Sequence, residues 1–444
     1  ARLATVVGAP GVGKTRLSRE LGLGVDDVAT VIEMRCRRSG TATFAPVADL
    51  LRSSADLDEH HSPDETRTAL RRLVDGLSDA DRVADLLTSF VGVGSDRSTE
   101  EAFFAVRRLF ESQARRQPVV IVVDDIQWAE PLFLDLLEHL AEWVDDAPML
   151  VLALARPEIR EIRPSLATEG RLVQAAIALE GLDADATAEL AARLVGAAEL
   201  PAELIGRLPQ STEGNPLFVR ELMRMLVDDG VIVESGTAWE LTIEADAVEV
   251  PPTIQSLLSA RLDRMPPDER RLVELASVVG SEFPLGAVLA VSEPGTSMHS
   301  LRGAMDRLRR RELVESAGRY RGDEPVFRFH HVLIRDAAYR RLLKRRRADL
   351  HTRIGEWTER TAVDLPGEHE APIAFHFEQA FAYRRELSDL DEEAADLGRR
   401  AAGLLRIAAE RALDRDDIAA AGALVERAVA CLDAGEPELS DLLM

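Results

Sequence analysis

The chain has 444 residues, a length that predicts three or four domains rather than one core. It carries 78 Asp and Glu against 54 Lys and Arg, and a net charge of −24 argues against a surface built to bind nucleic-acid backbones. No apolar run reaches the ~18 residues that a bilayer requires, and the two cysteines, Cys36 and Cys431, offer neither a disulfide framework nor a metal-ligand spacing. We therefore expect a cytoplasmic protein without a membrane partner.

The first part of the chain alternates short apolar runs with helical patterns. The apolar runs are Leu3–Val7, Ala29–Met34, Pro118–Val123, Met149–Ala155 and Leu172–Leu179, and the clearest helical patterns are Thr99–Arg115 and Pro131–Trp143. Continuous apolar strands that alternate with amphipathic helices indicate a parallel sheet with helices on both faces. We predict an α/β domain over residues 1–180.

The next stretch, residues 181–250, predicts a smaller helical unit. Its expected helices are Asp183–Val195 and Pro216–Asp228, and a hairpin is expected around Ser235–Gly236. Residues 251–343 are again mainly helical. The helix Met298–Arg311 leads there to short strands at Leu313–Ser316 and Val326–Phe329. Three helices and a small β-wing indicate a winged-helix domain.

The last stretch, residues 344–444, has only helical patterns. Ala421, Val425 and Ala428 have the small–large–small spacing of the second helix of a tetratricopeptide repeat, and Leu405, Ala408 and Ala412 can face them from the preceding helix. One repeat cannot bury its own face, so further repeats are expected after Met444. An ordinary helical hairpin explains the same pattern.

The segment GAPGVGKT, residues 8–15, matches G-x-x-x-x-G-K-[ST] at every fixed position. A predicted strand precedes it and a predicted helix follows it, which is the context that a phosphate-binding loop requires. The glycines let backbone N–H groups surround phosphates, and the helix N-terminus adds its positive dipole end. Lys14, one of only two lysines in the chain, is expected to reach the β- and γ-phosphates, and the Thr15 hydroxyl to ligate Mg²⁺. The expected nucleotide-binding residues here are Gly8, Ala9, Pro10, Gly11, Val12, Gly13, Lys14, Thr15 and Arg16.

The acidic half of such a site is expected in PVVIVVDDIQWAE, a buried strand that ends in Asp124 and Asp125. One carboxylate would hold the Mg²⁺ shell, and the other would orient or activate the attacking water. We assign Asp124 to the metal and Asp125 to the water, although the two roles could be exchanged. A strand that is simply capped by aspartate before the next helix is the alternative.

Several classes of phosphate-loop protein are excluded by missing motifs. A GTPase needs an Asn-Lys-x-Asp guanine reader, and the only lysines are Lys14 and Lys344. A protein kinase needs a different Gly-rich loop and a His-Arg-Asp catalytic loop. A small-molecule kinase remains open, but the long helical C-terminal half suits it poorly.

With these motifs in place, the chain resembles the signal-transduction ATPases with numerous domains (STAND), and in particular the ATPase modules of actinobacterial adenylate/guanylate cyclase fusions and large ATP-binding LuxR-type regulators. The resemblance covers essentially the whole chain. It is carried by VVDDIQWAEPLFLDLLEHL, LALARPE, EGNPLFVRELMRMLVDDG, VPPTIQSLLSARLDR and FRFHHVLIRDAAYRRLLKRRRADLH. It implies an α/β P-loop NTPase of the ASCE type, followed by a helical lid, a winged-helix domain and all-α tetratricopeptide-like helices, with ATP and ADP acting as a switch.

The resemblance also assigns roles to three residues outside the loop. Pro216, in Gly-Asn-Pro, matches the proline that packs on adenine from the lid, although Gly-Asn-Pro is also ordinary turn chemistry. Arg156, after the strand MLVLALA, matches an arginine that senses the γ-phosphate, or is a surface arginine before a proline. His331 aligns with a winged-helix histidine that touches the β-phosphate of ADP in related immune and apoptosome switches. In those switches the histidine belongs to a Met-His-Asp motif, and valine stands here where that motif has aspartate. A histidine that merely begins a helix is the alternative.

The expected activity is slow, regulatory ATP hydrolysis with Mg²⁺, catalysed by Asp125, Lys14 and Arg156. We interpret the chain as a piece of a longer polypeptide, because it starts almost on a strand at Ala1 and stops within a helical pattern. The resemblance implies that the effector, a cyclase or DNA-binding domain, lies outside it, as does a segment with a Gly-Arg-Glu-like motif that helps cover adenine. An unknown protein or small-molecule inducer would act through the C-terminal helices, and nucleotide-dependent self-association is plausible by family likeness.

Two other functions remain open. The first is a non-hydrolysing helical-repeat scaffold whose nucleotide is structural or lost. The second is a DNA-binding winged-helix regulator, because basic residues cluster at Arg307–Arg311 and Arg340–Arg347. A solvated face that is salt-bridged within this acidic chain accounts for the same clusters.

Overall fold

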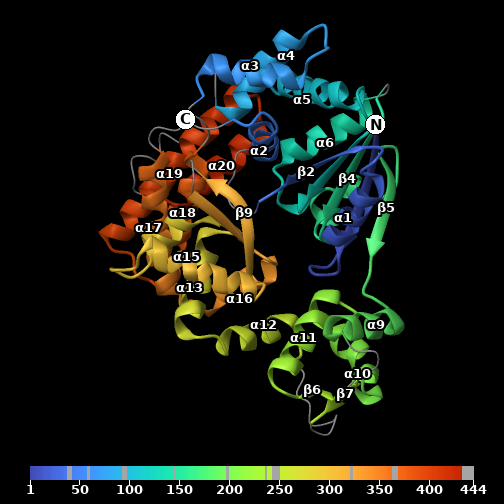
Figure 1. The fold of residues 1–444 in the computed structure, drawn as a ribbon. Helices are drawn as coiled ribbons and strands as arrows, with labels where there is room; N and C mark the ends of the chain where they lie inside the picture. The colour runs from blue at the N-terminus through green and yellow to red at the C-terminus, as the bar shows by residue number, and fades with distance from the viewer. Residues whose placement is uncertain are drawn as a thin grey trace.

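The structure is a computed structural model of the chain. It describes residues 1–37, 43–57, 61–92, 98–144, 147–196, 200–235, 238–242, 251–320, 324–362 and 369–432. The described elements follow one another around an open ring (Figure 1), so that the last helices lie beside the N-terminal unit.

The N-terminal unit is built on a five-stranded parallel sheet in the order β2-β3-β4-β1-β5. The strands are β1 (Arg2–Gly8), β2 (Thr30–Arg35), β3 (Val119–Asp124), β4 (Met149–Ala155) and β5 (Val173–Leu179). All five coincide with the predicted apolar runs to within one residue at each end. This agreement confirms the predicted α/β unit, because the runs are rich in the β-branched residues that buried parallel strands favour.

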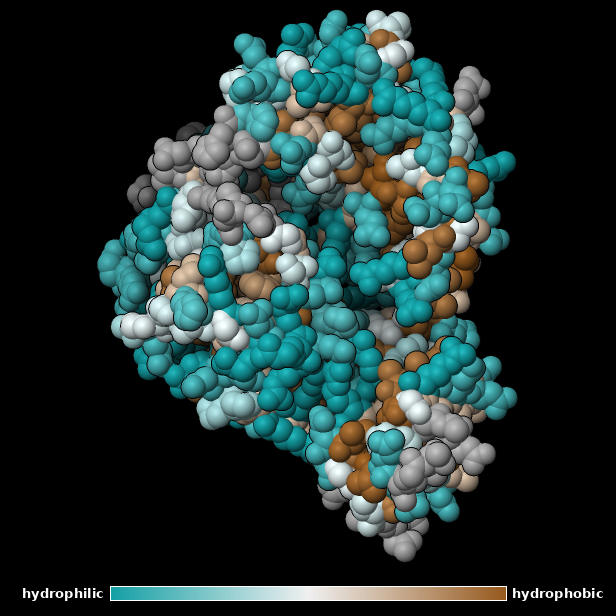
Figure 2. Space-filling model, in the orientation of Figure 1, coloured by the Kyte–Doolittle hydropathy of each residue, from teal (hydrophilic) through white to brown (hydrophobic). Residues whose placement is uncertain are grey.

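The two faces of the sheet are covered unequally. One face packs against α2 (Ala45–Ser54), α5 (Thr99–Ala114) and α6 (Pro131–Trp143) in the largest hydrophobic core of the described residues. The other face meets α1 (Lys14–Val25), whose outer side exposes large apolar side chains, and Figure 2 shows hydrophobic residues gathered on this side of the molecule. The exposed apolar side chains of this region are Leu17, Leu21, Leu23, Val28 and Ile177.

Several short helices of this unit were not predicted individually. They are α3 (Pro63–Leu73), α4 (Ala80–Leu87) and the 3-10 helix η1 (Thr88–Val91) between β2 and α5, η2 (Ile126–Trp128) after β3, and α7 (Ile159–Ile162) and α8 (Pro164–Ala167) after β4. α3 begins with Pro63 at its first position and a reciprocal capping box between Ser62 and Glu65.

A second helical unit follows β5 and has its own hydrophobic core. It consists of α9 (Ala184–Val195), α10 (Ala202–Thr212), α11 (Pro216–Asp228) and the antiparallel pair β6 (Ile232–Ser235) and β7 (Ala238–Leu241). The pairing of β6 with β7 agrees with the expected hairpin, but Gly236 of its turn lies outside the described residues.

The third unit packs five helices around a small antiparallel sheet in the order β8-β10-β9. Its elements are α12 (Ile254–Asp263), α13 (Pro267–Val279), β8 (Glu282–Pro284), α14 (Leu285–Val291), α15 (Met298–Arg310), β9 (Val314–Tyr320), β10 (Glu324–Phe329) and α16 (Val332–Arg341). The sequence predicted β9 and β10 but missed β8, because a three-residue strand has no measurable periodicity.

The chain ends in four helices, α17 (Lys344–Ala362), α18 (Glu370–Glu386), α19 (Glu392–Asp414) and α20 (Ile418–Ala430). Leu405 and Ala412 of α19 are buried with Ala421 and Ala428 of α20, as the repeat-like spacing predicted, whereas Val425 and Ala408 are half-buried. The helices return to the N-terminal unit, where α20 meets α6 and the Thr99 hydroxyl donates to the Arg415 carbonyl at 2.7 Å. This agrees with the predicted all-α C-terminal region.

Candidate functional site

The loop between β1 and α1 has the backbone that the GAPGVGKT segment predicts. Gly11 and Gly13 have φ angles of 84° and 113°, in the left-handed region that side chains disfavour. A Cβ on Gly11 would also stand 2.8 Å from the Leu217 Cβ and 2.9 Å from the Asn215 Oδ1. Gly11 is therefore required twice, by its conformation and by the close approach of α11.

Lys14 begins α1 and its side chain folds back over the loop. Its Nζ donates to the Gly8 and Ala9 carbonyls at 2.7 and 3.1 Å, and the side chain is buried. Burial lowers the pKa of Lys14 below its ordinary value, and the Asp125 and Asp124 carboxylates oppose that shift. The hydrogen bonds given for the ammonium go to these two carbonyls, and a phosphate could replace them.

The two predicted magnesium-binding residues lie next to each other. The Thr15 hydroxyl donates to the Asp124 Oδ2 at 3.1 Å, across from the N-terminus of α1 to the end of β3. Burial, followed by the charge of Asp125, raises the pKa of Asp124. A hydroxyl and a carboxylate at this distance fit the donor set of a Mg²⁺ site that would keep several waters and phosphate oxygens as its other ligands. No cluster of three or more His, Cys, Asp or Glu side chains suited to a metal occurs in the described part of the chain.

Asp125 follows directly and has a left-handed backbone, with φ at 59°. Its Oδ1 accepts from the Gln127 Nε2 at 2.8 Å, and its Oδ2 lies 3.2 Å from the Arg35 Nη2. The Arg156 Nε is 3.9 Å from Oδ1, and the Arg156 backbone N–H donates to the Gln127 Oε1 at 3.0 Å. Asp125 and Arg156, predicted from separate strands, thus meet at one edge of the sheet.

The Gly-Asn-Pro segment closes over the phosphate loop. The Asn215 Nδ2 donates to the Pro10 carbonyl at 3.0 Å, and the Leu217 N–H donates to the Gly11 carbonyl at 3.3 Å. The Asn215 Oδ1 also caps α11, so one side chain both starts the helix and ties it to the loop. Pro216 is half-buried at the first position of α11, beside these contacts.

His331 is the N-cap of α16, and its Nδ1 accepts from the Leu333 N–H at 3.1 Å. Burial, followed by the positive charges of Arg220, Arg156 and Lys14, lowers the pKa of His331 to about 3. The ring is therefore neutral at neutral pH and carries its proton on Nε2, where it is a hydrogen-bond donor. The position fits both readings of the sequence, because His331 starts a helix and also lies within reach of the charges of the phosphate site.

Arg16 lies apart from the other predicted residues. Its side chain is mostly exposed and forms an ion pair at 2.7 Å with Glu20, one turn along α1. A Cβ on Gly8 would stand 2.7 Å from the Leu179 carbonyl oxygen and 2.9 Å from the Val12 Cγ1, and Ala9, Pro10 and Gly13 form the remainder of the loop.

Four residues near the site were not predicted: Arg35, Gln127, Asn215 and Arg220. Arg35 could have been found, because β2 and β3 are parallel neighbours and Arg35 pairs in register with Asp124 at their carboxyl ends. Arg220 lies on α11, and its Nη1 is 3.2 Å from the His330 Nε2. No local sequence signal identifies that contact, because it joins residues 110 positions apart.

The basic clusters are largely engaged within the chain. Arg307 and Arg311 both pair with Glu269, at 2.7 and 3.0 Å. In the second cluster the pairs are Arg341 with Asp263 and Glu274, Lys344 with Glu386, and Arg345 with Asp389. Among the described residues, no helix has the length and apolar character that a membrane crossing demands.

Comparisons with known proteins identify the N-terminal unit. Residues 1–152 match the family model of the AAA ATPase domain, and residues 183–238 match a domain of unknown function (DUF8739). The first match confirms that the segment with the GAPGVGKT loop is a P-loop ATPase domain, the class of domain that binds a nucleotide.

The chain is also similar to longer proteins. It is 29% identical over 297 residues to an uncharacterized protein of Rhizobium meliloti. The aligned region covers 65% of this chain and 26% of that protein. The solved structures with a similar fold include a STAND protein with a tetratricopeptide repeat sensor from Pyrococcus horikoshii (16% identity, TM-score 0.48, 97% of this chain and 56% of that one). They also include the Orc1 protein of Aeropyrum pernix in complex with DNA (13% identity, TM-score 0.31, 76% and 86%) and Cdc6p from Pyrobaculum aerophilum (14% identity, TM-score 0.33, 77% and 88%). This chain thus spans about a quarter of the length of the Rhizobium protein.

Proposed function

We propose that the chain is the nucleotide switch of a larger STAND-type regulatory protein, in which bound ADP holds a closed, inactive state and bound Mg·ATP favours an open one. Its domains would be the ATPase domain at residues 1–180, a lid at 181–250, a winged-helix domain at 251–343 and a helical sensor from 344 onward. The observation that carries the proposal is the contact of Asn215 and Leu217 with the phosphate loop, because it closes a separate helical unit over the site where a nucleotide would bind.

The proposed nucleotide contacts divide between the units. The loop N–H groups and Lys14 would hold the β- and γ-phosphates, and Pro216 would lie on adenine. His331 would donate from Nε2 to a β-phosphate oxygen, which suits a ring that stays neutral at neutral pH. A switch requires the nucleotide to bind the two states with different affinity, and a contact from the third unit supplies such a difference only when that unit is docked.

The proposed hydrolysis is slow. Thr15 and Asp124 would hold Mg²⁺, which supplies charge neutralisation at the phosphates when bound. Asp125 would accept a proton from the water whose oxygen attacks the γ-phosphorus, while the bond from that phosphorus to the bridging oxygen breaks and ADP leaves. Arg156 would stabilise the charge on the transferred phosphoryl group.

The basic clusters weigh against direct DNA binding by this part of the protein. Arg307, Arg311 and Arg341 are paired with carboxylates within the chain, so phosphate contacts would first have to break those pairs. The net charge of −24 adds long-range repulsion. We therefore place the output function in a domain beyond this segment, and the input at the C-terminal helices.

The test is to purify the 444-residue chain, denature it and identify any released nucleotide by anion-exchange chromatography. We expect near-stoichiometric ADP. His331→Ala should lower the ADP affinity about tenfold, because one hydrogen bond to a charged acceptor is lost. His299→Ala, at an exposed position of α15, is the matched control. A chain that carries no nucleotide and does not bind added Mg·ATP would instead support the scaffold function.

A further inference from the structure

Arg35 occupies a position that links two parts of the molecule. It is the last residue of β2, in register with Asp124 of β3, and its Nη2 lies 3.2 Å from the Asp125 Oδ2. Burial opposes the charge of Arg35, but Asp124 and Asp125 outweigh it and raise the pKa of the guanidinium. Arg35 is therefore a permanent cation placed against the carboxylate that is proposed to receive the proton.

The Asp125 carboxylate is held from both of its oxygens. Gln127 donates to Oδ1, and Arg35 pairs with Oδ2. Asp125 has a left-handed backbone, and such a strained conformation persists only where its surroundings fix it. Each oxygen keeps a second lone pair, so this clamp orients the carboxylate without occupying it fully.

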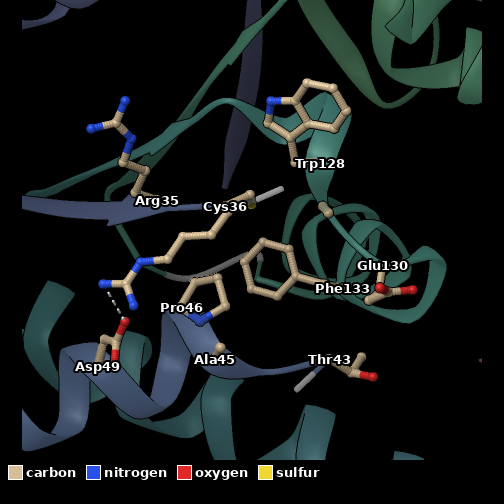
Figure 3. Close-up of a pocket in the computed structure, with 11 residues that line it drawn as sticks. Arg35, Cys36, Thr43, Ala45, Pro46, Asp49, Trp128, Glu130 and Phe133 are labelled. Carbon is tan, nitrogen blue, oxygen red and sulfur yellow. Dashed lines mark ion pairs between the residues drawn. The ribbon is translucent and has the colours of Figure 1, made fainter. Parts of the chain in front are cut away.

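The same segment continues to the third unit. The Cys36 N–H donates to the Asp124 carbonyl at 3.0 Å, and the Arg37 Nη2 lies 2.9 Å from the Glu282 Oε2 of β8. Arg37 also pairs with Asp49 of α2 at 3.2 Å, the ion pair that is drawn as a dashed line in Figure 3. Figure 3 shows Cys36 between this pair and Trp128, in a hollow of the N-terminal unit that is lined by residues of β2, α2 and α6.

We propose that Arg35 is a positioning residue for Asp125, and that the segment from Arg35 to Arg37 couples this carboxylate to the unit that carries Glu282. The proposal rests on the proposed function, because it assigns a regulatory role within the same ATPase site. When β8 is docked, Glu282 and Asp49 share the Arg37 guanidinium and fix the end of β2. When β8 moves away, Arg37 retains only Asp49, and the end of β2 with Arg35 becomes freer to shift.

The test compares Arg35→Gln, Arg35→Lys and Glu282→Gln with the unaltered 444-residue chain in steady-state Mg·ATP hydrolysis. We expect Arg35→Gln to lower kcat about tenfold or more at nearly unchanged KM, because a misoriented carboxylate is a poor proton acceptor. Arg35→Lys should recover part of the rate, since it restores the charge but not the planar fork. Glu282→Gln should lower kcat about two- to fivefold, because it weakens only the indirect link.

Two further measurements separate positioning from a structural role. The ADP dissociation constant, measured by calorimetry, should stay within about twofold in Arg35→Gln. The second is the kcat of Arg35→Lys relative to that of Arg35→Gln, because a restored positive charge recovers the rate only if Arg35 acts on the Asp125 carboxylate. Arg67→Gln on α3, which removes an exposed ion pair with Asp85 of α4, is the arginine control.

The outcomes distinguish the inference from the function it rests on. If Arg35→Gln hydrolyses ATP at the unaltered rate, or loses ADP affinity in proportion to kcat, Arg35 does not position Asp125 and the inference is wrong, while the proposed function stands. If Glu282→Gln has the same kcat as the unaltered chain, the proposed coupling between Asp125 and the unit that carries Glu282 is wrong. If the unaltered chain binds ADP but hydrolyses no ATP, the hydrolytic part of the proposed function fails and the inference fails with it.

Discussion

Two polar clusters in this molecule show opposite ways to bury charge-bearing groups. The phosphate site gathers Lys14, Asp124, Asp125, Arg35 and Arg156, whose charges balance only in part. The second cluster lies where α16, α17 and α18 meet, and there the Tyr339 hydroxyl is 2.8 Å from the His351 Nε2 and 2.9 Å from the Tyr383 hydroxyl. The His351 Nδ1 lies 2.9 Å from the His376 Nδ1.

The histidines of the second cluster are neutral. Burial, followed by the charge of Arg335, lowers the pKa of His376 to about 3, and burial holds the pKa of His351 well below its ordinary value. Arg347 lies over the rings of Tyr339 and Tyr383, with its Cζ 4.6 and 5.5 Å from their centroids. The polar groups of this cluster thus satisfy one another and have little capacity for a ligand.

The phosphate site differs in having capacity left over. Lys14 is bonded to carbonyls, Asp124 has a raised pKa, and His331 is neutral with its Nδ1 engaged by the Leu333 N–H. The contrast teaches that burial and a shifted pKa do not by themselves mark a functional site. A binding site also needs charges that are incompletely paired and main-chain donors in a loop, as at Gly11 and Gly13.

The largest effect that would test this contrast is expected at Lys14. Lys14→Ala should weaken ATP binding by about 3 kcal/mol or more, over a hundredfold, because the loop then lacks its only ammonium. Titration with a fluorescent ATP analogue measures it. Lys344→Ala is the matched control, since Lys344 is the only other lysine and forms a half-exposed ion pair with Glu386. Equal affinity in both variants would mean that the loop does not bind phosphate through Lys14.

The next effect concerns stability instead of binding. His376→Ala should destabilise the helical half by about 3 kcal/mol, because it leaves a cavity and removes the partner of the buried His351 Nδ1. Thermal unfolding should show a midpoint lowered by roughly 5–10 °C, with the ADP dissociation constant unchanged. Loss of ADP binding without loss of stability would mean that this cluster communicates with the nucleotide and is not merely structural.

Much of the fold could be predicted from the sequence, and the reasons are local. The five strands of the sheet are continuous apolar runs, and the phosphate loop is a contiguous motif with a strand before it and a helix after it. In contrast, β8 is too short for a periodic signal. The helices of residues 45–91 were not predicted individually because each is at most 11 residues long, too short for a helical period to stand out from its surroundings.

The site could be predicted only where its residues are contiguous in sequence or end a recognisable strand. Lys14, Thr15, Asp124 and Asp125 meet that condition, and the structure brings them together. Asn215 does not, because its contact with Pro10 joins residues 205 positions apart and depends on how the second unit docks. The same holds for Arg37 and Glu282, whose ion pair depends on the placement of whole units that no local pattern encodes.

The smallest expected effect is the pH dependence of stability that the second cluster contributes. The pKa of His376 is about 3 in the folded chain and about 6.5 when unfolded, so the unfolded chain binds the extra proton between those values. The contribution is therefore complete above about pH 6.5 and is lost progressively as the pH falls toward 3. From pH 7 to pH 5.5 it should amount to about 1 kcal/mol.

The measurement compares how much the unfolding free energy changes with pH in different variants. Unfolding free energies at pH 7 and pH 5.5 are compared for the unaltered chain, His376→Ala and the exposed-site variant His299→Ala. The difference in unfolding free energy between the two pH values should become smaller by about 1 kcal/mol in His376→Ala alone. Only this variant removes a buried neutral ring. The phosphate site would act in the opposite sense, since a carboxyl with a raised pKa, such as Asp124, gains stability on protonation. An unchanged pH sensitivity in His376→Ala would show that the ring takes up a proton while folded, and the distinction between a neutral and a charged cluster would then no longer hold.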